Sequence, residues 1–448
     1  MYGAAQWGRE AYIKSFEKFT YKTPTRDVTE VPHCVAFADW AMEREYSFLA
    51  NSVMIPITHT DKNVESTPAY PKCLDYGTEA EYIEANGFGE YVSQSNEIFR
   101  TGGGGDVLWV LFLKKEILKS SKIKDSDIRQ IVCADSLYQR IGLMFEQHQN
   151  EKMKDRTRHS HGQCGWCPFY GGFQRRIRRL LRKGNPYFIE LDWTRYDGTI
   201  PNFLIWKIKD FRFRMLAKRF RTPQNRAVYD WYVSNLLNRH VLMPSGEVTL
   251  QTCGNPSGQV STTMDNNMIN TWLQAFEFCY VNGLTFDEAV DGWDDYDTII
   301  YGDDRLSTTP YMPIDYVDRV VDMYAQFFGM WVKPEKVKVS DTVIGLAFCG
   351  FTVLPDLSPV PTDPRKLIAS LNTPLKRLSD PESLFCKLQC FQILMANLPD
   401  EDPIKEWVAK ALFILAQHLR ASGREVPTTF TRDMLVSVWR GGPKDDLA

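Results

Sequence analysis

Long hydrophobic runs are absent from this sequence, and so are internal repeats and low-complexity segments. The longest apolar runs, such as residues 107–113, are far shorter than the ~20 residues that a helix needs to cross a bilayer. The start of the chain lacks the pattern of a secretory signal peptide. We therefore expect a cytoplasmic protein without a membrane anchor of its own.

A framework of regularly spaced cysteine pairs is also lacking, because the 10 cysteines are scattered along the 448 residues. Scattered cysteines favour a reduced protein with free thiols. His159, His161, Cys164 and Cys167 have the ligand types of a zinc site, but their spacing is cramped and no second Cys-x-x-Cys pair exists. A zinc site and a plain loop both remain open for this segment, and the loop is favoured.

A strong excess of charge of one sign is missing too, since the formal net charge is −3. The distribution is uneven, however, because basic residues crowd residues 152–183 and 207–221 whereas acidic residues gather over 287–304. A basic surface that follows phosphates, with acidic residues kept apart for metals, predicts nucleic-acid binding. We place Arg175 and Arg176 on that surface, and an ordinary charged helix face is the alternative.

The most informative stretch is Tyr301-Gly302-Asp303-Asp304, which lies between two short β-prone segments. A Gly-Asp pair in such a position predicts a hairpin turn. Two adjacent carboxylates repel each other, so bringing them together costs free energy unless a cation neutralises them. Mg²⁺ suits a cluster of hard oxygen ligands and usually also holds substrate phosphates. The alternative is a solvated acidic turn, since one tetrapeptide is a weak signal.

A further carboxylate, Asp192, follows the apolar run of residues 187–191, which predicts a buried strand that ends at Asp192. Together with Asp303 and Asp304 on a hairpin, this carboxylate suits a site with two metal ions about 3.5–4 Å apart. Such a pair of ions holds the attacking and leaving oxygens of nucleotidyl transfer in line. Taken alone, Asp192 is equally compatible with a helix N-cap.

A loop rich in glycine and hydroxyl groups covers residues 254–263 and leads into a helix predicted over residues 264–278. Small residues let the backbone approach a ligand closely. Ser257, Thr262 and Asn266 offer polar groups to a sugar or a phosphate. An ordinary loop with a helix cap explains Pro256 and Ser257 but not the density of small polar residues.

The order and the sequences of these three blocks resemble motifs A, B and C of viral RNA-dependent RNA polymerases. The blocks are most similar to those of the astrovirus polymerases, within the picornavirus- and calicivirus-like group. Motif A, Asp-x4-Asp, and motif C, Gly-Asp-Asp, are matched by Asp192 and Asp197 and by Gly302, Asp303 and Asp304. Motif B, Ser-Gly-x3-Thr-x3-Asn, is matched by Ser257, Gly258, Thr262 and Asn266.

The resemblance implies the roles of these residues. Asp192, Asp303 and Asp304 would be catalytic and would hold two Mg²⁺ ions, with Mn²⁺ as a substitute. A site that hydrogen-bonds a hydroxyl group rejects an analogue that lacks it, because polar groups are then left unpaired. The resemblance therefore places the following residues in the nucleotide site or against RNA: Asp197, Ser257 and Asn266 around the ribose 2′-hydroxyl, Thr262 beside them, and Gly258 against RNA.

Weaker matches extend the resemblance to motifs F and D. Residues 114–131 resemble motif F, a basic hairpin over the nucleotide channel, which implies Arg129 as a triphosphate ligand supported by Lys114 and Lys124. A solvated charged face is the alternative there. Residues 328–336 resemble motif D, in which Lys336 would be the general acid that protonates pyrophosphate. The choice among lysines stays open, because Lys333 and Lys338 lie close by.

Two further segments are placed by position only. Residues 348–351 lie at the position expected for motif E, although their sequence differs from that of motif E in related groups. Ser66 and Thr67 lie in a segment that resembles motif G, which guides the RNA template. A proline-rich loop is the plain alternative for this second segment.

Composition agrees with a large soluble protein, since 44% of the residues are hydrophobic and 24% are charged. A chain of 448 residues should form several lobes. The resemblance implies an α+β, multidomain, right-hand polymerase with fingers, palm and thumb. The fingers would cover 1–185, with an N-terminal segment that bridges to the thumb. The palm, an antiparallel sheet plus helices, would cover 186–220 and 254–360, with a return to the fingers over 221–253. Spaced apolar residues over 384–398 and 404–419 predict helices for the thumb, 361–448.

The function implied is RNA-dependent RNA synthesis that replicates the genome of a positive-strand RNA virus. The implied partners are RNA template and product, ribonucleoside triphosphates, other viral replication proteins and, as a candidate, a protein primer. The expected location is the host cytoplasm, at viral replication complexes. One alternative is a catalytically silent RNA-binding scaffold with the same fold, which three intact carboxylates disfavour. Another is an RNA-templated DNA polymerase, which Asp197 and Asn266 disfavour.

Overall fold

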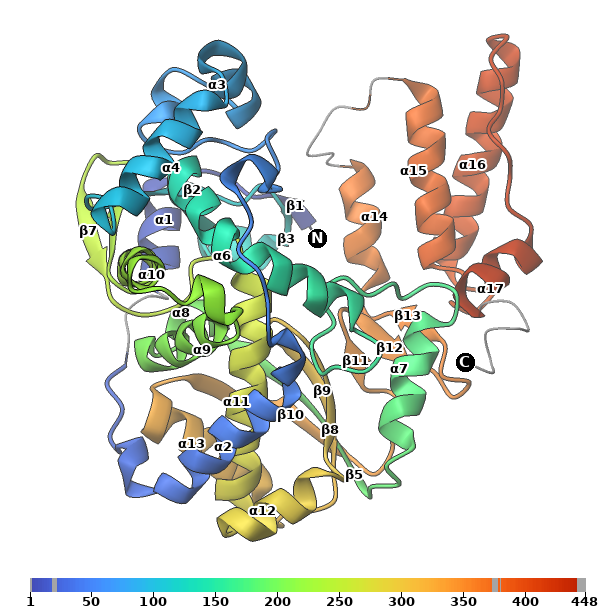
Figure 1. Ribbon diagram of the computed structural model, residues 1–448. Coiled ribbons are helices and arrows are strands. Elements are labelled where there is room, and N and C mark those ends of the chain that lie inside the picture. The colour runs from blue at the N-terminus through green and yellow to red at the C-terminus, as the bar shows by residue number, and fades with distance from the viewer. Residues whose placement is uncertain (1, 18–21, 373–377, 379, 441–448) are drawn as a thin grey trace.

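A computed structural model describes residues 2–17, 22–372, 378 and 380–440 of the chain (Figure 1). Its helices and strands form two four-stranded sheets, two smaller sheets and a helical C-terminal part within these residues. None of the helices in the described ranges is long and apolar enough to span a membrane. All ten cysteines are free thiols.

The central sheet is antiparallel, with the strand order β10-β5-β9-β8. Alternating burial along β5 points one face toward the interior, and the β-branched Ile299 and Ile300 of β8 are fully buried. In β10 the register shifts between Val332 and Val337, which bends this edge strand. The four strands are β5 (Tyr187–Thr194), β8 (Asp297–Tyr301), β9 (Asp304–Thr309) and β10 (Trp331–Ser340).

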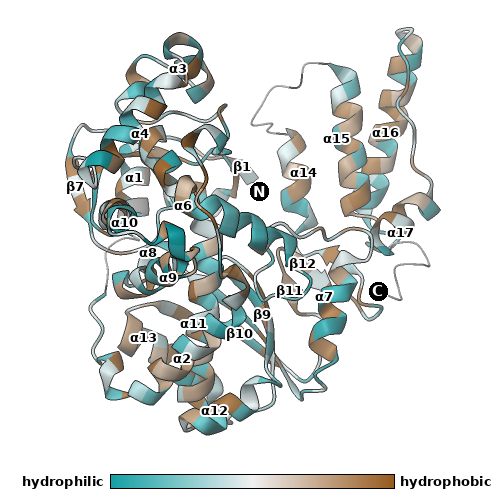
Figure 2. Ribbon diagram, in the orientation of Figure 1, coloured by the Kyte–Doolittle hydropathy of each residue, from teal (hydrophilic) through white to brown (hydrophobic). Residues whose placement is uncertain are grey.

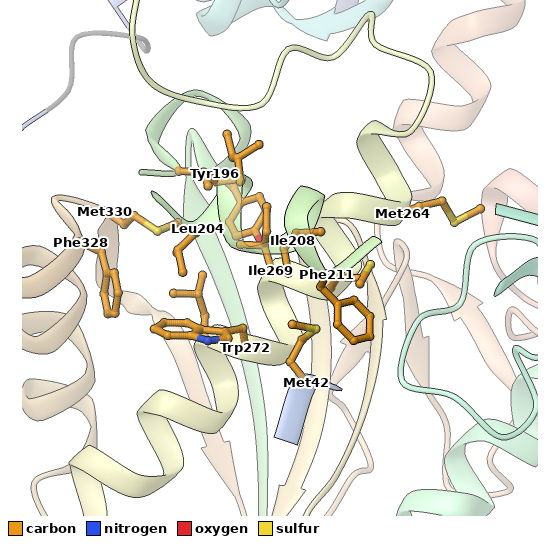
Figure 3. Packing of buried hydrophobic residues seen from close by; sticks show 14 of the residues in the cluster. Met42, Tyr196, Leu204, Ile208, Phe211, Met264, Ile269, Trp272, Phe328 and Met330 are labelled. Carbon is orange, nitrogen blue, oxygen red and sulfur yellow. The ribbon is translucent and has the colours of Figure 1, made fainter. Parts of the chain in front are cut away.

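Helix α11 (Thr262–Asn282) is buried on nearly every side and forms the centre of the largest hydrophobic core. A helix buried all round belongs to the interior of a large protein. Figure 3 shows Ile269 and Trp272 of this helix packed among Leu204, Ile208 and Phe328. The helices that pack against α11 are α2 (Pro32–Glu45), α9 (Asn202–Arg214), α12 (Phe286–Trp293) and α13 (Tyr316–Phe328).

The second four-stranded sheet has the order β4-β2-β6-β7 and joins two distant parts of the chain. The buried Trp109 of β2 lies opposite Val241 of β6 in a parallel pair. The strands are β2 (Leu108–Leu113), β4 (Gln130–Cys133), β6 (Arg239–Leu242) and β7 (Val248–Gln251). Helix α10 (Pro223–Leu237) contacts β6 of this sheet and also packs against α4 (Gly89–Thr101) and α6 (Ser136–Asp155). Helix α3 (Glu79–Asn86) precedes α4 in the chain.

The C-terminal part is a helical unit with its own core, in which Phe385 and Leu388 pack with Val408 and Leu412. Figure 2 shows hydrophobic residues along both long helices of this unit. Its helices are α14 (Pro364–Asn372), α15 (Pro381–Leu394), α16 (Pro403–Ala421) and α17 (Arg432–Arg440). A small sheet leads into it, made of β11 (Ala347–Phe348), β12 (Phe351–Val353) and β13 (Pro359–Pro361).

The N-terminus lies beside the C-terminal unit (Figure 1). Strand β1 (Tyr2–Ala4) pairs with β3 (Ile117–Lys119), and the Tyr2 hydroxyl donates a hydrogen bond to Asp363 just before α14. Burial beside that carboxylate raises the pKa of Tyr2 to about 12. The remaining helices are α1 (Arg9–Phe16), α5 (Ser120–Lys124), α7 (Gly172–Leu181) and α8 (Tyr196–Thr199).

Candidate active site

The Gly302-Asp303 pair forms the tight turn between β8 and β9, in which Tyr301 lies opposite Asp304. Gly302 has a φ of 67°, a left-handed conformation that glycine adopts without strain. Helix α11 holds this turn from below through two side chains. Asn267 accepts a hydrogen bond from the Gly302 N–H at 2.7 Å, and the Asn270 amide donates to the Gly302 carbonyl at 3.0 Å. These two asparagines fix the orientation of the acidic turn.

The register of the central sheet brings Asp192 to the same place. In the β5–β9 pair Leu191 lies opposite Arg305, so the next position along each strand sets Asp192 opposite Asp304. Asp197 follows on the short helix α8, entered through Arg195 with a φ of 57°. The sheet and the turn thus gather the carboxylates of both acidic blocks at one end of the strands.

The carboxylates at this end of the central sheet lie close together and repel one another. Desolvation by the surrounding protein raises the pKa of Asp304 to about 7, and repulsion from Asp303, Glu190 and Asp192 adds to the rise. The pKa of Asp303 is also raised, first by desolvation and then by Asp197 and Asp192. One carboxylate of such a group binds a proton near neutral pH unless a cation takes its place. Crowded, partly desolvated carboxylate oxygens are the donor set that Mg²⁺ prefers, so these residues fit that ion.

Two basic side chains face the carboxylates in different ways. Lys336 lies at the bulge of β10 and forms an ion pair with Asp192 at 3.0 Å. Lys338 instead pairs with Glu190 at 2.7 Å, and Lys333 lies over the Trp331 ring. Of these three lysines, Lys336 is the one that pairs with Asp192, and its role as the general acid stays a prediction.

Arg129 reaches the site from the basic hairpin. Its guanidinium binds the Glu116 carboxylate through two hydrogen bonds, one of them 2.8 Å long. Glu116 raises the pKa of Arg129, and Asp303 and Asp197 contribute at longer range, which places this arginine close to both acidic blocks. The sequence did not indicate Glu116 as the partner of Arg129, because the two residues are 13 positions apart and only the folded hairpin brings them together. Lys114 and Lys124, predicted beside Arg129, are exposed on the same hairpin and on α5.

The loop of motif B packs against the hairpin through Gly258. The Gly258 N–H donates to the Val132 carbonyl at 3.1 Å, and a Cβ at Gly258 would lie 2.4 Å from that oxygen. Glycine is therefore required here for close approach. Ser257 is exposed and its hydroxyl donates to the Gln130 carbonyl at 3.3 Å, so it lies at the edge of the site.

Thr262 and Asn266 hold the loop in shape. The Thr262 hydroxyl donates to the Pro256 carbonyl at 2.8 Å at the start of α11. Asn266 is buried and its side-chain oxygen accepts from Asn255 at 2.9 Å. The Asn255 N–H in turn donates to the Asp197 carbonyl at 2.6 Å. This chain of contacts connects Asp197 with Asn266, two of the three residues predicted to sense the 2′-hydroxyl.

A buried charged cluster, made of Glu146, Lys209, Arg212 and Asp265, lies beneath this loop. Lys209 is 2.8 Å from Glu146 and 2.7 Å from Asp265, and Arg212 is 2.7 Å from Asp265. Gln259 of the loop donates to Asp265 at 2.7 Å, so the cluster anchors the loop directly. Nothing in the sequence indicated these pairs, because the four residues come from three helices.

The cluster predicts sensitivity to acid. The positive charges of Arg212 and Lys209 overcome desolvation and hold the pKa of Glu146 at about 2. A carboxyl group with a depressed folded-state pKa stabilises the fold above its unfolded pKa of about 4.3 and loses that contribution as the pH falls toward 2. The free energy of unfolding of wild type should therefore drop steeply between these values, measured by denaturant titration at each pH. The Glu146→Gln variant should be less stable at pH 7 and show a flatter profile, whereas an equally steep profile would contradict this role.

The segment at the position of motif E forms a hairpin that contacts motif C. Cys349 and Gly350 make the two-residue turn between β11 and β12, with φ of 52° and 76°. The Cys349 N–H donates to the Asp304 carboxylate at 2.8 Å, which lowers the pKa of Asp304 against the other effects. The sequence indicated the position of this segment but not its contact with the acidic turn.

The remaining predicted RNA-binding residues lie apart from the carboxylates. Ser66 accepts a hydrogen bond from Lys62 at 2.9 Å, and Thr67 accepts from the Ala69 N–H, both in the loop before α3. Arg175 and Arg176 lie on α7. Arg176 is buried and donates to Gln163 at 3.1 Å and to Thr157 at 3.0 Å, so most of its donors are used inside the protein and its predicted exposure is corrected.

The zinc alternative is not supported by geometry. A metal site needs at least three His, Cys, Asp or Glu side chains whose ligand atoms lie close together. Among the described residues, such a group, with ligand atoms within 4.8 Å of one another, is formed by His33, Cys34 and Cys279. His159, His161, Cys164 and Cys167 do not gather in this way. Instead residues 161–163 run along β8, where His161 accepts from the Ile300 N–H and Gln163 donates to the Ile300 carbonyl.

Comparison with known proteins places this geometry in a family. Residues 2–371 match the family described as viral RNA-dependent RNA polymerase. The chain is 57% identical over 445 residues to non-structural polyprotein 1AB of Mink astrovirus 1 and 55% identical over 443 residues to that of Human astrovirus-1. Each alignment covers 99% of this chain but only 32% and 30% of the polyprotein, so the chain spans about a third of these relatives.

A solved structure supports the fold. The Sicinivirus 3Dpol RNA-dependent RNA polymerase superposes with a TM-score of 0.73, covering 98% of this chain and 92% of that one, at 16% identity. This likeness confirms the α+β fold of a right-hand polymerase that the motifs predicted. The carboxylates at the strand ends, the family match and the polyprotein relatives agree, and the chain belongs to the viral RNA-dependent RNA polymerases, with astrovirus relatives.

Proposed function

We propose that this chain copies an RNA template into RNA by two-metal nucleotidyl transfer. The observation that carries the proposal is the convergence of Asp192, Asp303 and Asp304 at one end of the central sheet, with Arg129 close by. Desolvation, with repulsion from neighbouring carboxylates added to it, raises the pKa of Asp303 and Asp304, so cations that neutralise these groups would stabilise the site.

Asp192, Asp303 and Asp304 would hold Mg²⁺, or Mn²⁺ in its place. When bound, such ions neutralise phosphate charge and favour ionisation of the attacking 3′-hydroxyl. The protein itself supplies positioning and charge around them. Arg129 exchanges its Glu116 partner for the triphosphate, which its planar guanidinium can bind through two oxygens. Lys336, held beside Asp192, is placed to give a proton to the departing pyrophosphate.

Selection of ribonucleotides would rest on Asp197 and Asn266, which Asn255 connects. A buried network loses hydrogen bonds when the 2′-hydroxyl is missing, so deoxynucleotides are disfavoured. The test is incorporation of ribonucleotides against deoxynucleotides on one primed RNA template with Mg²⁺. We expect at least about a 10²-fold preference for ribonucleotides in kcat/KM. Equal incorporation, or a preference for deoxynucleotides, would favour an RNA-templated DNA polymerase.

Arg129 gives a second expected result. Replacing Arg129 with alanine should raise the KM for each ribonucleotide and lower kcat/KM by roughly 10–100-fold, because a charge-assisted hydrogen-bond pair is lost. Arg129→Lys should recover only part of this, since an ammonium cannot bind two oxygens in a fixed plane. Lys115→Ala, an exposed residue on the same hairpin, is the matched control. Unchanged KM in Arg129→Ala would remove this arginine from the nucleotide site.

Contacts between distant segments support the proposed division into lobes. Residues 221–253 supply β6 and β7 to the sheet of β2 and β4, which supports a return of this segment to the fingers. The pairing of β1 with β3 and the contact of Tyr2 with Asp363 support an N-terminal segment that bridges to the thumb. We propose fingers over 1–185 and 221–253, palm over 186–220 and 254–360, and thumb over 361–448, of which 441–448 lie outside the described residues.

The partners proposed are RNA template and product, ribonucleoside triphosphates and other proteins of a viral replication complex. The polyprotein relatives support this setting, because each carries roughly two thirds of its length outside the aligned segment. A protein primer remains part of the proposal, with its hydroxyl taking the place of the RNA 3′-hydroxyl at Asp192 and Asp303. The proposed location is the host cytoplasm.

A further inference from the structure

A cavity of about 710 Å³ lies at the opposite end of β8 from the acidic turn. It is lined by the end of α2, by residues 156–161, by α7 with the two residues that follow it, and by residues 293–297. Asp297 begins β8 and Tyr301 ends it, so the two ends are about 13 Å apart at ~3.3 Å per residue. In Figure 1 the helices α2, α7 and α12 surround this lower part of the central sheet.

The lining is strongly basic, with eight Arg and Lys residues against three carboxylates, an excess of five positive charges. The three carboxylates already have partners. Asp297 binds Arg179 at 2.9 Å, Asp294 binds Arg44 at 2.7 Å, and Glu45 accepts from the His161 N–H at 2.7 Å. The excess positive charge therefore belongs to other side chains of the cavity.

Those side chains come from two segments that converge, residues 156–158 and residues 175–183. In the part of the chain that the structure describes, Arg156, Arg158 and Arg182 are exposed and form no ion pair. Arg156 lies over the ring of Phe48, which also lines the cavity. Side chains from separate segments that repel one another and point at one space are stabilised when an anion enters it.

Buried polar atoms give a second, independent observation. His161 is 9% exposed and its buried Nδ1 has no hydrogen-bond partner within the described structure. The Nε of Arg175 is likewise buried and unpartnered there. Burial together with Arg175, Arg179 and Arg158 lowers the pKa of Arg176 to about 10, as expected where positive charge is not balanced. Such atoms cost free energy unless a ligand satisfies or neutralises them.

We propose that this cavity is a second, non-catalytic nucleotide site that binds the polyphosphate group of a nucleoside triphosphate. Guanidinium groups bind phosphate oxygens in pairs, and five excess positive charges suit a triphosphate group with about four negative charges. A volume of about 710 Å³ lies in the range of ~300–1,000 Å³ that is typical of small-molecule sites. A cavity of this volume, with three acidic residues in its lining, favours a small polyanion over an extended RNA strand, which needs a long continuous basic groove.

The test is binding of a fluorescent ATP analogue, N-methylanthraniloyl-ATP, without divalent ions and in an Arg129→Ala background that weakens the catalytic site. Tripolyphosphate should displace the analogue. Arg158→Glu combined with Arg182→Glu should weaken binding about 10-fold or more, because each lost guanidinium contact to phosphate is charge-assisted. Arg178→Glu is the matched control, since this exposed arginine of α7 does not line the cavity, and it should bind as the background does.

Several outcomes would overturn the proposal. They are absence of saturable binding, unchanged binding by the double variant, or displacement by an RNA oligonucleotide but not by tripolyphosphate, which would identify an RNA-binding surface instead. Should the double variant unfold, Arg158→Ala alone must still weaken binding measurably. The assay reads binding and not synthesis, so failure of the polymerase proposal would leave its result unaffected.

Discussion

Asp303→Asn should abolish RNA synthesis, with a loss on the order of 10³-fold or more, while the protein stays folded. The carboxylate lies in the tight turn that two asparagines of α11 hold in place, facing Asp192 and Asp197. An amide removes the negative charge that the metal ions need but keeps the shape and hydrogen-bonding capacity of the side chain. Since desolvation, together with repulsion from Asp197 and Asp192, raises the pKa of Asp303, removing its charge should leave thermal stability unchanged or slightly higher without metal.

The measurement is nucleotide incorporation beside a thermal unfolding curve for each variant. Asp287→Asn is the matched control, because this exposed aspartate lies in the first turn of α12 and away from the turn. Its activity should equal that of wild type. Near-normal synthesis by folded Asp303→Asn would refute the metal assignment. Folded wild type that binds RNA but incorporates nothing, with or without a primer, would restore the scaffold alternative.

Asp265→Ala should destabilise the protein by ~3–5 kcal/mol, because it leaves buried positive charge on Lys209 and Arg212 without its partner. Asp265 has no exposed surface and lies 2.7 Å from each of these two groups. Water cannot reach the charges that remain, and Glu146 alone cannot neutralise both. The loop that carries Ser257 and Gly258 should loosen as well, since Gln259 binds Asp265 directly.

Chemical denaturation of the two proteins measures this difference in the free energy of unfolding. Glu43→Ala provides the control, because its ion pair with Arg214 is exposed, with 41% and 44% of the two side chains accessible. Surface pairs contribute only ~0–1 kcal/mol, so this variant should unfold almost as wild type does. A loss below ~1 kcal/mol in Asp265→Ala would show that the cluster is not the anchor of the loop.

Local patterns predicted the scaffold of the site well. The apolar run at 187–191 predicted β5, and the Gly-Asp turn predicted the β8–β9 hairpin, because both signals depend on neighbouring residues. Both elements form as expected. Spaced apolar residues likewise predicted α15 and α16. Boundaries differ by a few residues, since β5 continues to Thr194 and α11 runs from Thr262 to Asn282. Strand ends and helix ends depend on tertiary packing that a local pattern does not contain.

Local sequence patterns could not predict the partners of the site residues. Glu116 beside Arg129, Asn267 beneath the turn and Cys349 beside Asp304 depend on how distant elements pack. The same reason explains the one site prediction that needed correction. Arg176 lies in a basic run typical of a surface, but α7 turns it inward, where Gln163 and Thr157 bind it. Charge alone does not show which face of a helix is buried, because an arginine can lie inside the protein when other side chains bind it.

The most direct test of the central claim is primer extension on a short RNA template of known sequence with Mg²⁺ and ribonucleotides. The account predicts a product that grows to template length and stops at the expected position whenever one ribonucleotide is omitted. Such stops show that the template, and not the enzyme alone, selects each nucleotide. Extension that ignores the template sequence, or no extension by folded protein with primer and RNA bound, would contradict it.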